Sequence, residues 1–339
     1  MAPITERAAR PAPDRNLALE LVRVTEAAAM ATGRWVGRND PAGALTAAVE
    51  AMRAMIGTVE MAGTVVIGDG PDCDTDGEVR LARGELVGEG TGAAYDIAAD
   101  PVDGITFTTK GLANAVSVLA VAPRGALFDP SACARMDVLV AGREAREHVD
   151  LRQPVRDNVQ RLAKVRQCHV EDVTVGMLAR PHHEERAREV RDAGARIRFL
   201  TGGEVTAAIV AASPQTGIDL LIGSGGTAES VIAACAVKCL GGTLQGTPAP
   251  ADGPELARLQ DAGIDAEAVL DVDDLVRGDD VFFVLTGITD GELVRGVRYG
   301  PDVATTDSLA MRARSGTVRR MQSDHRLDRL ARYSAVDYQ

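Results

Sequence analysis

Apolar residues recur at helical spacing in two segments near the start of the chain. Residues 16–37 (NLALELVRVTEAAAMATGRWVG) show this period, with Asn16 as a plausible N-terminal cap. Residues 42–56 predict a second helix after the GRNDPAG break. Residues 1–15 combine prolines with mixed charge, which predicts a disordered lead-in.

Strand patterns follow these helices. The predicted strands are 63–70 (GTVVIGDG), 95–100 (YDIAAD), 114–123 and 136–142. Two helices followed by strands indicate an α+β layer. A polar stretch near 143–157 ends it, so we expect an N-terminal α+β domain over residues 16–155.

Strands and helices alternate in the second half, which indicates a C-terminal α/β domain over residues 156–339. Its predicted strands are 173–179, 195–200, 218–226 and 280–287, and its predicted helices are 182–194, 203–212 and 227–242. Residues 245–255 predict a Pro/Gly-rich loop before a short helix. The basic tail, 309–330, is expected to pack against the domain or a neighbouring subunit, so we expect a homo-oligomer.

Composition narrows the classes of partner. The 339 residues are 45% hydrophobic but 3% aromatic, so Ala, Val, Leu and Ile must build the core. The net charge of −12 disfavours nucleic acid and anionic membranes as partners. No signal-peptide pattern or run of eighteen apolar residues occurs, and the five cysteines lack a metal-binding spacing. These features predict a cytoplasmic protein with reduced thiols.

Acidic residues stand where predicted strands end. Asp69 ends one strand, Asp100 ends another, and Asp103 lies on the turn that Pro101 and Gly104 shape. Carboxylates converging in this way hold the divalent cations that phosphate-monoester hydrolysis requires. The alternative is a solvent-facing turn, because Asp, Pro and Gly are common turn residues.

Glu229 follows GSGGTA and falls in the first turn of the next predicted helix. Backbone N–H groups at such a helix start can also bind phosphate oxygens. The alternative for Glu229 is a favourable interaction with the helix dipole alone.

Six segments resemble class II fructose bisphosphatases, a family of the metal-dependent, lithium-sensitive phosphatase superfamily. They are LVRVTEAAAMATGRWVGRND, GTVVIGDG, DIAADPVDG, GSGGTAES, LTGITDGEL and GTVRRMQSDHRLDR, in order from about residue 16 to 329. The resemblance implies an α/β fold, the layered α/β/α/β/α sandwich of the sugar phosphatases. It also implies a Mg²⁺- or Mn²⁺-dependent monoesterase that removes the 1-phosphate from a sugar bisphosphate.

The resemblance assigns four metal ligands, three of which are also catalytic. Asp100 and Glu229 match the family, whereas Asp69 and Asp103 stand where the family has glutamate. Leu45 replaces a metal-binding aspartate, with Pro41 in place of a lysine.

Ile105 replaces the threonine that orients the attacking water, and it offers no hydroxyl. Thr106 is the candidate catalytic replacement, although strand-like alternation would point it elsewhere.

The substrate pocket implied by the resemblance is also changed. Arg180-Pro181-His182 stands for a Lys-Pro-Arg phosphate clamp, Gly202-Gly203-Glu204 for an Asp-Gly-Asp that holds sugar hydroxyls, and Arg135 for a tyrosine. The candidate substrate-binding residues are Gly104, Ile105, Arg135, Arg180, His182, Gly203, Glu204 and Gly226. The alternative for Arg180 and His182 is a surface position.

Three hypotheses follow. The favoured one is a metal-dependent phosphatase acting on a sugar phosphate or sugar-nucleotide other than fructose 1,6-bisphosphate. The second is a catalytically inactive homologue that binds a sugar phosphate or a partner, which the loss of functional groups at Leu45 and Ile105 motivates. The third is non-hydrolytic chemistry on a phosphorylated sugar.

Overall fold

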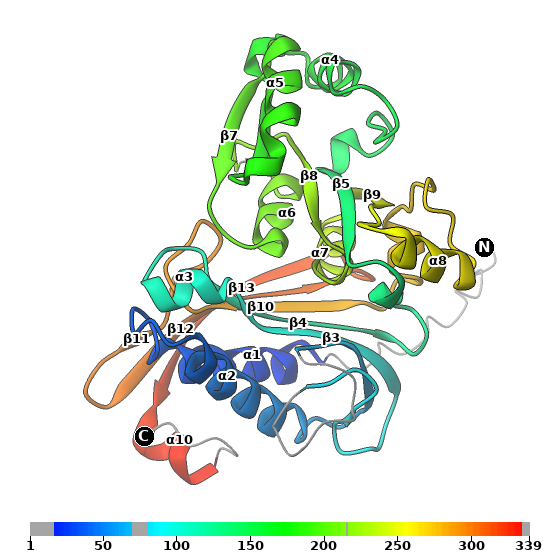
Figure 1. Ribbon diagram of the computed structural model, residues 1–339. Coiled ribbons are helices and arrows are strands. Elements are labelled where there is room, and N and C mark those ends of the chain that lie inside the picture. Colours follow the sequence, from blue (N-terminus) through cyan, green and yellow to red (C-terminus); the bar gives the residue numbers. More distant parts are fainter. Residues whose placement is uncertain (1–16, 70–80, 215, 334–339) are drawn as a thin grey trace, which may run out of the picture.

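Two β-sheets separate three layers of helices in the computed structural model (Figure 1). The structure describes residues 17–69, 81–214 and 216–333. The predicted lead-in at 1–15, the proposed cap Asn16 and Gly70 lie outside these ranges. Among the described residues, no helix is both long and apolar enough to cross a membrane.

The first sheet has eight strands and mixes parallel with antiparallel pairing. Its order is β11-β12-β10-β4-β3-β1-β2, and β13 pairs with β12 in addition. Strand β1 runs parallel to β3, and the other pairs are antiparallel. The strands are β1 (Ala62–Ile67), β2 (Leu86–Val87), β3 (Ala94–Asp103), β4 (Val116–Pro123), β10 (Phe282–Gly287), β11 (Arg298–Tyr299), β12 (Val303–Arg312) and β13 (Thr317–Arg326).

The second sheet has five strands in the order β7-β6-β8-β5-β9. Strand β6 is parallel to β7 and β8, and β5 is antiparallel to β8 and β9. The strands are β5 (Arg135–Ala141), β6 (Thr174–Leu178), β7 (Arg196–Leu200), β8 (Leu220–Gly226) and β9 (Thr243–Pro248). Because β5 joins this sheet and β10 to β13 join the first, both sheets draw on both halves of the chain. The domain boundary near residue 155 stays a prediction.

Helices cover both outer faces and fill the space between the sheets (Figure 1). Helices α1 (Ala18–Gly33) and α2 (Pro41–Ile56) pack on the outer face of the first sheet, and α4 (Val155–Arg166) and α5 (Glu184–Asp192) on that of the second. Helices α6 (Glu204–Ala212) and α7 (Thr227–Leu240) lie between the sheets. This arrangement confirms the predicted α/β/α/β/α sandwich.

Shorter elements complete the chain. They are α3 (Ile105–Lys110), α8 (Gly253–Asp261), α9 (Val272–Leu275), α10 (Leu327–Tyr333) and the 3₁₀ turns η1 (Pro130–Ala132), η2 (Arg143–Ala145), η3 (Val170–Asp172) and η4 (Pro181–His183).

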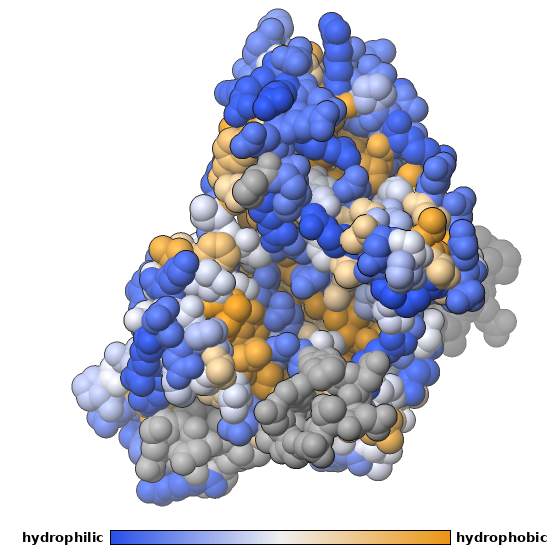
Figure 2. Space-filling model, viewed as in Figure 1, coloured by the Kyte–Doolittle hydropathy of each residue, from blue (hydrophilic) through white to orange (hydrophobic). Residues whose placement is uncertain are grey.

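Strand alternation explains how the first sheet serves two cores. In β4, Val118 packs toward α6 and α7, whereas the adjacent Leu119 packs toward α1 and α2; in β10, Phe283 and Phe282 divide in the same way. Side chains alternate between the faces of a strand, so a sheet buried on both faces needs a continuous apolar run. On the face in Figure 2, hydrophilic side chains cover most of the upper part, and apolar side chains are more visible lower down.

One sequence-based element assignment was wrong, and two further stretches gain a structure that the pattern did not specify. Strand β9 occupies the start of the predicted loop at 245–255, because its backbone pairs with β5 and Gly246 leaves room for the side chain of Met136. The basic tail forms most of the β12–β13 hairpin, whose polar residues are tolerated at the exposed edge. Helix α4 begins inside the polar stretch at 143–157.

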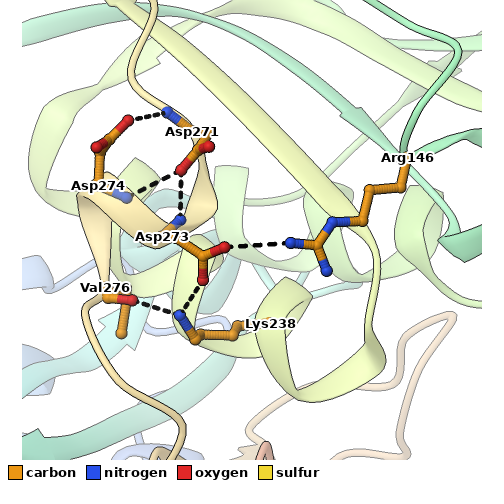
Figure 3. Close-up of polar contacts among 6 residues, drawn as sticks. All are labelled: Arg146, Lys238, Asp271, Asp273, Asp274 and Val276. Atoms are coloured by element: carbon orange, nitrogen blue, oxygen red, sulfur yellow. Dashed lines mark hydrogen bonds and ion pairs between the residues drawn. The ribbon is translucent and has the colours of Figure 1, made fainter.

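A cluster of polar side chains holds the C-terminal end of α7 in place (Figure 3). Lys238 in its last turn pairs with Asp273 and donates to the carbonyl oxygen of Val276 at 2.6 Å. Arg146 contacts the other oxygen of Asp273 at 3.2 Å, and Asp271 forms a capping box at the start of α9. These contacts fix one end of the helix whose opposite end carries Glu229.

Candidate functional site

A cavity of about 240 Å³ lies where β1, β3 and α7 meet. Three of the four predicted metal ligands line it: Asp69 after β1, Asp100 in β3 and Glu229 in the first turn of α7. The other lining residues are Leu45, Ile67, Gly68, Ala99, Val102, Ile105, Ala228 and Ile232. The fold therefore brings carboxylates from three separate segments into one space.

A break in strand pairing presents Asp100 to this cavity. Asp100 is opposite Val118 of β4, but Asp103 is opposite Val116, so one extra residue lies on the β3 side. Pro101, which cannot donate to a ladder, lies inside this bulge. The N–H of Val102 donates to Oδ1 of Asp100 at 3.0 Å and fixes the carboxylate.

The predicted turn at Pro101–Gly104 lies mostly within a strand, because β3 continues to Asp103 and the chain turns only at Gly104. Gly104 has a φ of +96°, which favours glycine, and α3 starts at the next residue. Ile105 lines the cavity, whereas Thr106 is exposed on the helix and is not among the lining residues. The strand parity used to judge Thr106 was wrong, because this segment is helical.

Charge repulsion is concentrated in the cavity. Burial raises the pKa of Asp100 well above its usual range, and the charges of Asp103, Glu229 and Asp69 raise it further. Burial, and then the charge of Glu204, also raises the pKa of Glu229. Bound cations would relieve this repulsion and favour the ionised carboxylates.

Asp103 points elsewhere. Its buried carboxylate lies against Gly203, and the N–H of Thr206 in α6 donates to it. Its Oδ2 has no hydrogen-bond partner in the described part of the chain. Burial, followed by the charges of Glu204 and Glu229, raises the pKa of Asp103 to about 7. Asp103 is not among the residues that line the cavity.

Within the described ranges, no three His, Cys, Asp or Glu side chains form a group tight enough to hold a metal ion. The four-ligand set of Asp69, Asp100, Asp103 and Glu229 therefore stays a prediction. Leu45 supplies an apolar wall on the α2 side of the cavity.

A second group of polar residues lies at the entry to α7. Arg180 pairs with Oε1 of Glu204 at 2.6 Å, and the N–H of Gly226 donates to Oε2 at 2.8 Å. Gly203 caps α6 and leaves room for Asp103, because a Cβ there would overlap its carboxylate. Glu204 therefore joins the predicted clamp residue Arg180 to the start of α7.

Arg135 and His182 lie in an adjacent polar cavity of about 770 Å³. A guanidinium N–H of Arg135 lies 3.1 Å from Nε2 of His182 and donates to Oγ of Ser224 at 3.2 Å. Burial lowers the pKa of His182, and the neighbouring His183 and Arg135 lower it further.

His183 is buried and fixes the end of β8. The N–H of Ser224 donates to its Nε2 at 3.0 Å, so Nδ1 carries the proton and donates to the carbonyl of Leu178 at 2.9 Å. Sequence reasoning missed Ser224, whose only signal was a polar residue within the glycine-rich strand end.

A five-layer sandwich in which carboxylates from β3, from α7 and from the segment after β1 share one cavity is typical of the metal-dependent sugar phosphatases. The sequence model described as "Bacterial fructose-1,6-bisphosphatase, glpX-encoded" matches residues 15–325. The chain is 39% identical over 328 residues to "Fructose-1,6-bisphosphatase 1 class 2" of Escherichia coli K12, covering 93% of this chain and 96% of that protein. The values are the same for "Fructose-1,6-bisphosphatase class 2" of Shigella flexneri.

The chain belongs to the class II fructose-1,6-bisphosphatase family. It is accordingly a phosphoric monoester hydrolase of a metal-dependent family.

Proposed function

We propose that this protein hydrolyses a phosphate monoester of a sugar phosphate with the help of Mg²⁺ or Mn²⁺. The observation that carries the proposal is the convergence of Asp69, Asp100 and Glu229 on one cavity. Relatives that the chain matches over 96% of their length are named fructose-1,6-bisphosphatases, which supports a phosphorylated sugar as the substrate class.

The donor set fits a hard divalent cation, because Mg²⁺ and Mn²⁺ prefer carboxylate oxygens. Asp69, Asp100 and Glu229, which line the cavity, would hold it. The bound cation supplies a water of lowered pKa and positive charge beside the phosphoryl oxygens. We assign Arg180 and Glu204 to the sugar side of the pocket.

We further propose that fructose 1,6-bisphosphate is not the preferred substrate. Arg135, His182, Gly202 and Glu204 differ from the residues implied by the resemblance. Glu204 lies at the entry to α7, and Arg135 and His182 lie in the adjacent cavity. A pocket that presents different hydrogen-bonding groups discriminates strongly between substrates that differ in hydroxyl or phosphate positions. A homo-oligomer and a cytoplasmic location stay predictions.

The test is phosphate release from a panel of sugar mono- and bisphosphates, including fructose 1,6-bisphosphate, with Mg²⁺ or Mn²⁺ added. We expect release from at least one member, strict dependence on added metal, and loss of activity in Asp100→Asn. A panel without any phosphate release would contradict the proposed hydrolase activity. Fructose 1,6-bisphosphate as the best substrate would contradict only the substrate assignment.

A further inference from the structure

Asn114 is a buried asparagine that links three separate segments of the chain. It lies between α3 and β4 and is 6% exposed. Its Nδ2 donates to the carbonyl oxygen of Thr201, between β7 and α6, at 2.6 Å. Its Oδ1 accepts the N–H of Glu292, in the loop after β10, at 2.9 Å. The backbone N–H of Asn114 donates to the carbonyl oxygen of Asp290 in the same loop, also at 2.9 Å.

The chemistry and the conformation of this position both suit asparagine. Its φ of +73° lies in the left-handed region, which asparagine adopts more readily than most residues with a side chain. The carbonyl of Thr201 can only accept and the N–H of Glu292 can only donate, so the side chain between them must supply one donor and one acceptor. A carboxylate or an aliphatic side chain cannot satisfy both partners.

The segment that Asn114 holds contains two consecutive glycines. Gly202 has a φ of +151°, and neither it nor Gly203 has a Cβ, so their backbone is freer than that of other residues. A Cβ at position 202 would lie 3.1 Å from the Cβ of Asn114, and one at position 203 would overlap the carboxylate of Asp103. Neighbouring side chains therefore enclose a segment that has little stiffness of its own.

The path of this segment decides where the first turn of α6 lies. Glu204 directly follows the two glycines, and its Oε2 accepts the N–H of Gly226 at 2.8 Å. Two residues further on, the N–H of Thr206 donates to Asp103. Because the glycines carry no side chain, Glu204 is the group through which this segment can contact a sugar, and its position depends on the backbone that Asn114 holds.

We propose that Asn114 is a positioning residue for sugar recognition, which places Glu204 in the pocket by holding the carbonyl of Thr201. The inference rests on the proposed function, which assigns Glu204 to the sugar side. The carboxylates proposed to hold the cation come from other segments and line a different cavity from Asn114. Asn114 therefore controls the affinity for the sugar and leaves the hydrolytic step unchanged.

An exposed ion pair joins two of the same segments and provides a matched control. Arg198 of β7 pairs with Glu292 at 2.9 Å, and the two side chains are 42% and 33% exposed. Such exposed pairs contribute little to stability, whereas the side chain of Asn114 is buried. Arg198→Gln removes a contact between β7 and the loop after β10 but keeps the contacts of Asn114.

Two variants of Asn114 separate the lost donor from an added charge. Asn114→Asp retains the shape and an acceptor oxygen but loses the donor, and Asn114→Gly removes the side chain without adding charge. Glycine also adopts the same φ without strain. Hydrogen–deuterium exchange of the full chain, followed by mass spectrometry, reports on the amides of Thr206 and Gly226. We expect both amides to exchange about tenfold faster or more in both variants and at the wild-type rate in Arg198→Gln.

Steady-state kinetics with the best substrate of the sugar phosphate panel test the consequence for recognition. Both Asn114 variants should raise KM about tenfold or more and change kcat less than about threefold, because the hydrolytic end is untouched. Rates with p-nitrophenyl phosphate, a monoester without a sugar, should stay within about twofold of the wild-type rates. Thr25→Ala, which removes a buried hydroxyl that is hydrogen-bonded to Thr286, controls for lost stability and should change neither constant.

The inference is overturned if exchange at either amide is unchanged in the Asn114 variants, or if KM is unchanged. An effect confined to Asn114→Asp also overturns it, because the added charge would then be the cause. A kcat that falls equally for the sugar phosphate and for p-nitrophenyl phosphate overturns it as well, since that is the result of a general structural loss. A wild-type chain without phosphate release contradicts the proposed function instead, and the exchange measurement then still decides the role of Asn114.

Discussion

Replacing Asp103 by asparagine tests the electrostatic account of the site. The side chain is 5% exposed, and burial, with the charges of Glu204 and Glu229, raises its pKa from 3.8 to about 7. The folded chain therefore keeps this proton up to about neutral pH, whereas the unfolded chain loses it near pH 4. Between those limits the folded state binds more protons, so the free energy of unfolding falls as pH rises.

The size of the effect follows from the pKa difference. Each pKa unit corresponds to about 1.4 kcal/mol, so ionised Asp103 lowers the free energy of unfolding by up to about 4 kcal/mol above pH 7. Asparagine has nearly the same shape and no charge, and its amide oxygen can still accept the N–H of Thr206. Without metal, Asp103→Asn should therefore raise the free energy of unfolding by about 2–4 kcal/mol at pH 8 and by little at pH 4.5.

Urea denaturation in EDTA at the two pH values measures this difference. Asp192→Asn, at the exposed end of α5, is the control and should show no such pH dependence. An Asp103→Asn effect that is equal at both pH values, or a less stable variant at pH 8, would refute the reasoning. Added Mn²⁺ should shrink the advantage of the variant, because cations offset the same repulsion.

Three further predictions concern the cavity and its support. Ile105→Thr should raise metal-dependent phosphate release about tenfold or more, because a hydroxyl at this position can orient water. The control Ile105→Val should not raise it, and equal rates in the two variants would contradict the prediction. Since the pKa values of Asp100 and Glu229 are raised, protons compete with metal, so calorimetry should show weaker Mn²⁺ binding at pH 6 than at pH 8; equal affinities would contradict this. Asp40→Ala removes the oxygen that accepts the N–H of Gly43 at the start of α2, and should lower the free energy of unfolding by about 1 kcal/mol in urea titrations; an unchanged midpoint would contradict this.

The sequence predicted those helices and strands whose own residues show the apolar periodicity of a helix or a strand. The helix at 42–56 and the strand at 280–287 have apolar positions with the period of the structure that they form, and α2 and β10 follow them closely. Strand β9 could not be predicted in this way. Its glycine and proline indicate a turn locally, and it is a strand because β5 supplies the partner backbone.

The same distinction between local and long-range contacts applies to the residues of the candidate site. Asp69, Asp100 and Glu229 were placed by strand ends and a helix start, which are local features, and the three share a cavity. The direction of Asp103 depends on a bulge against β4 and on α6, more than a hundred residues further along the chain. A local sequence pattern does not reveal such contacts. It does not reveal the contact between Arg135 and His182 either.

Leu45 and Ile105, which looked like two independent losses in the sequence, belong to one apolar wall. Both pack against the cluster formed by Ala48, Val102 and Ala115, and both line the metal cavity. A lone aspartate at position 45 would lie against this apolar wall, where desolvation raises the cost of its charge. Because both residues build the same wall, we expect the effects of restoring polar groups at positions 45 and 105 to be non-additive.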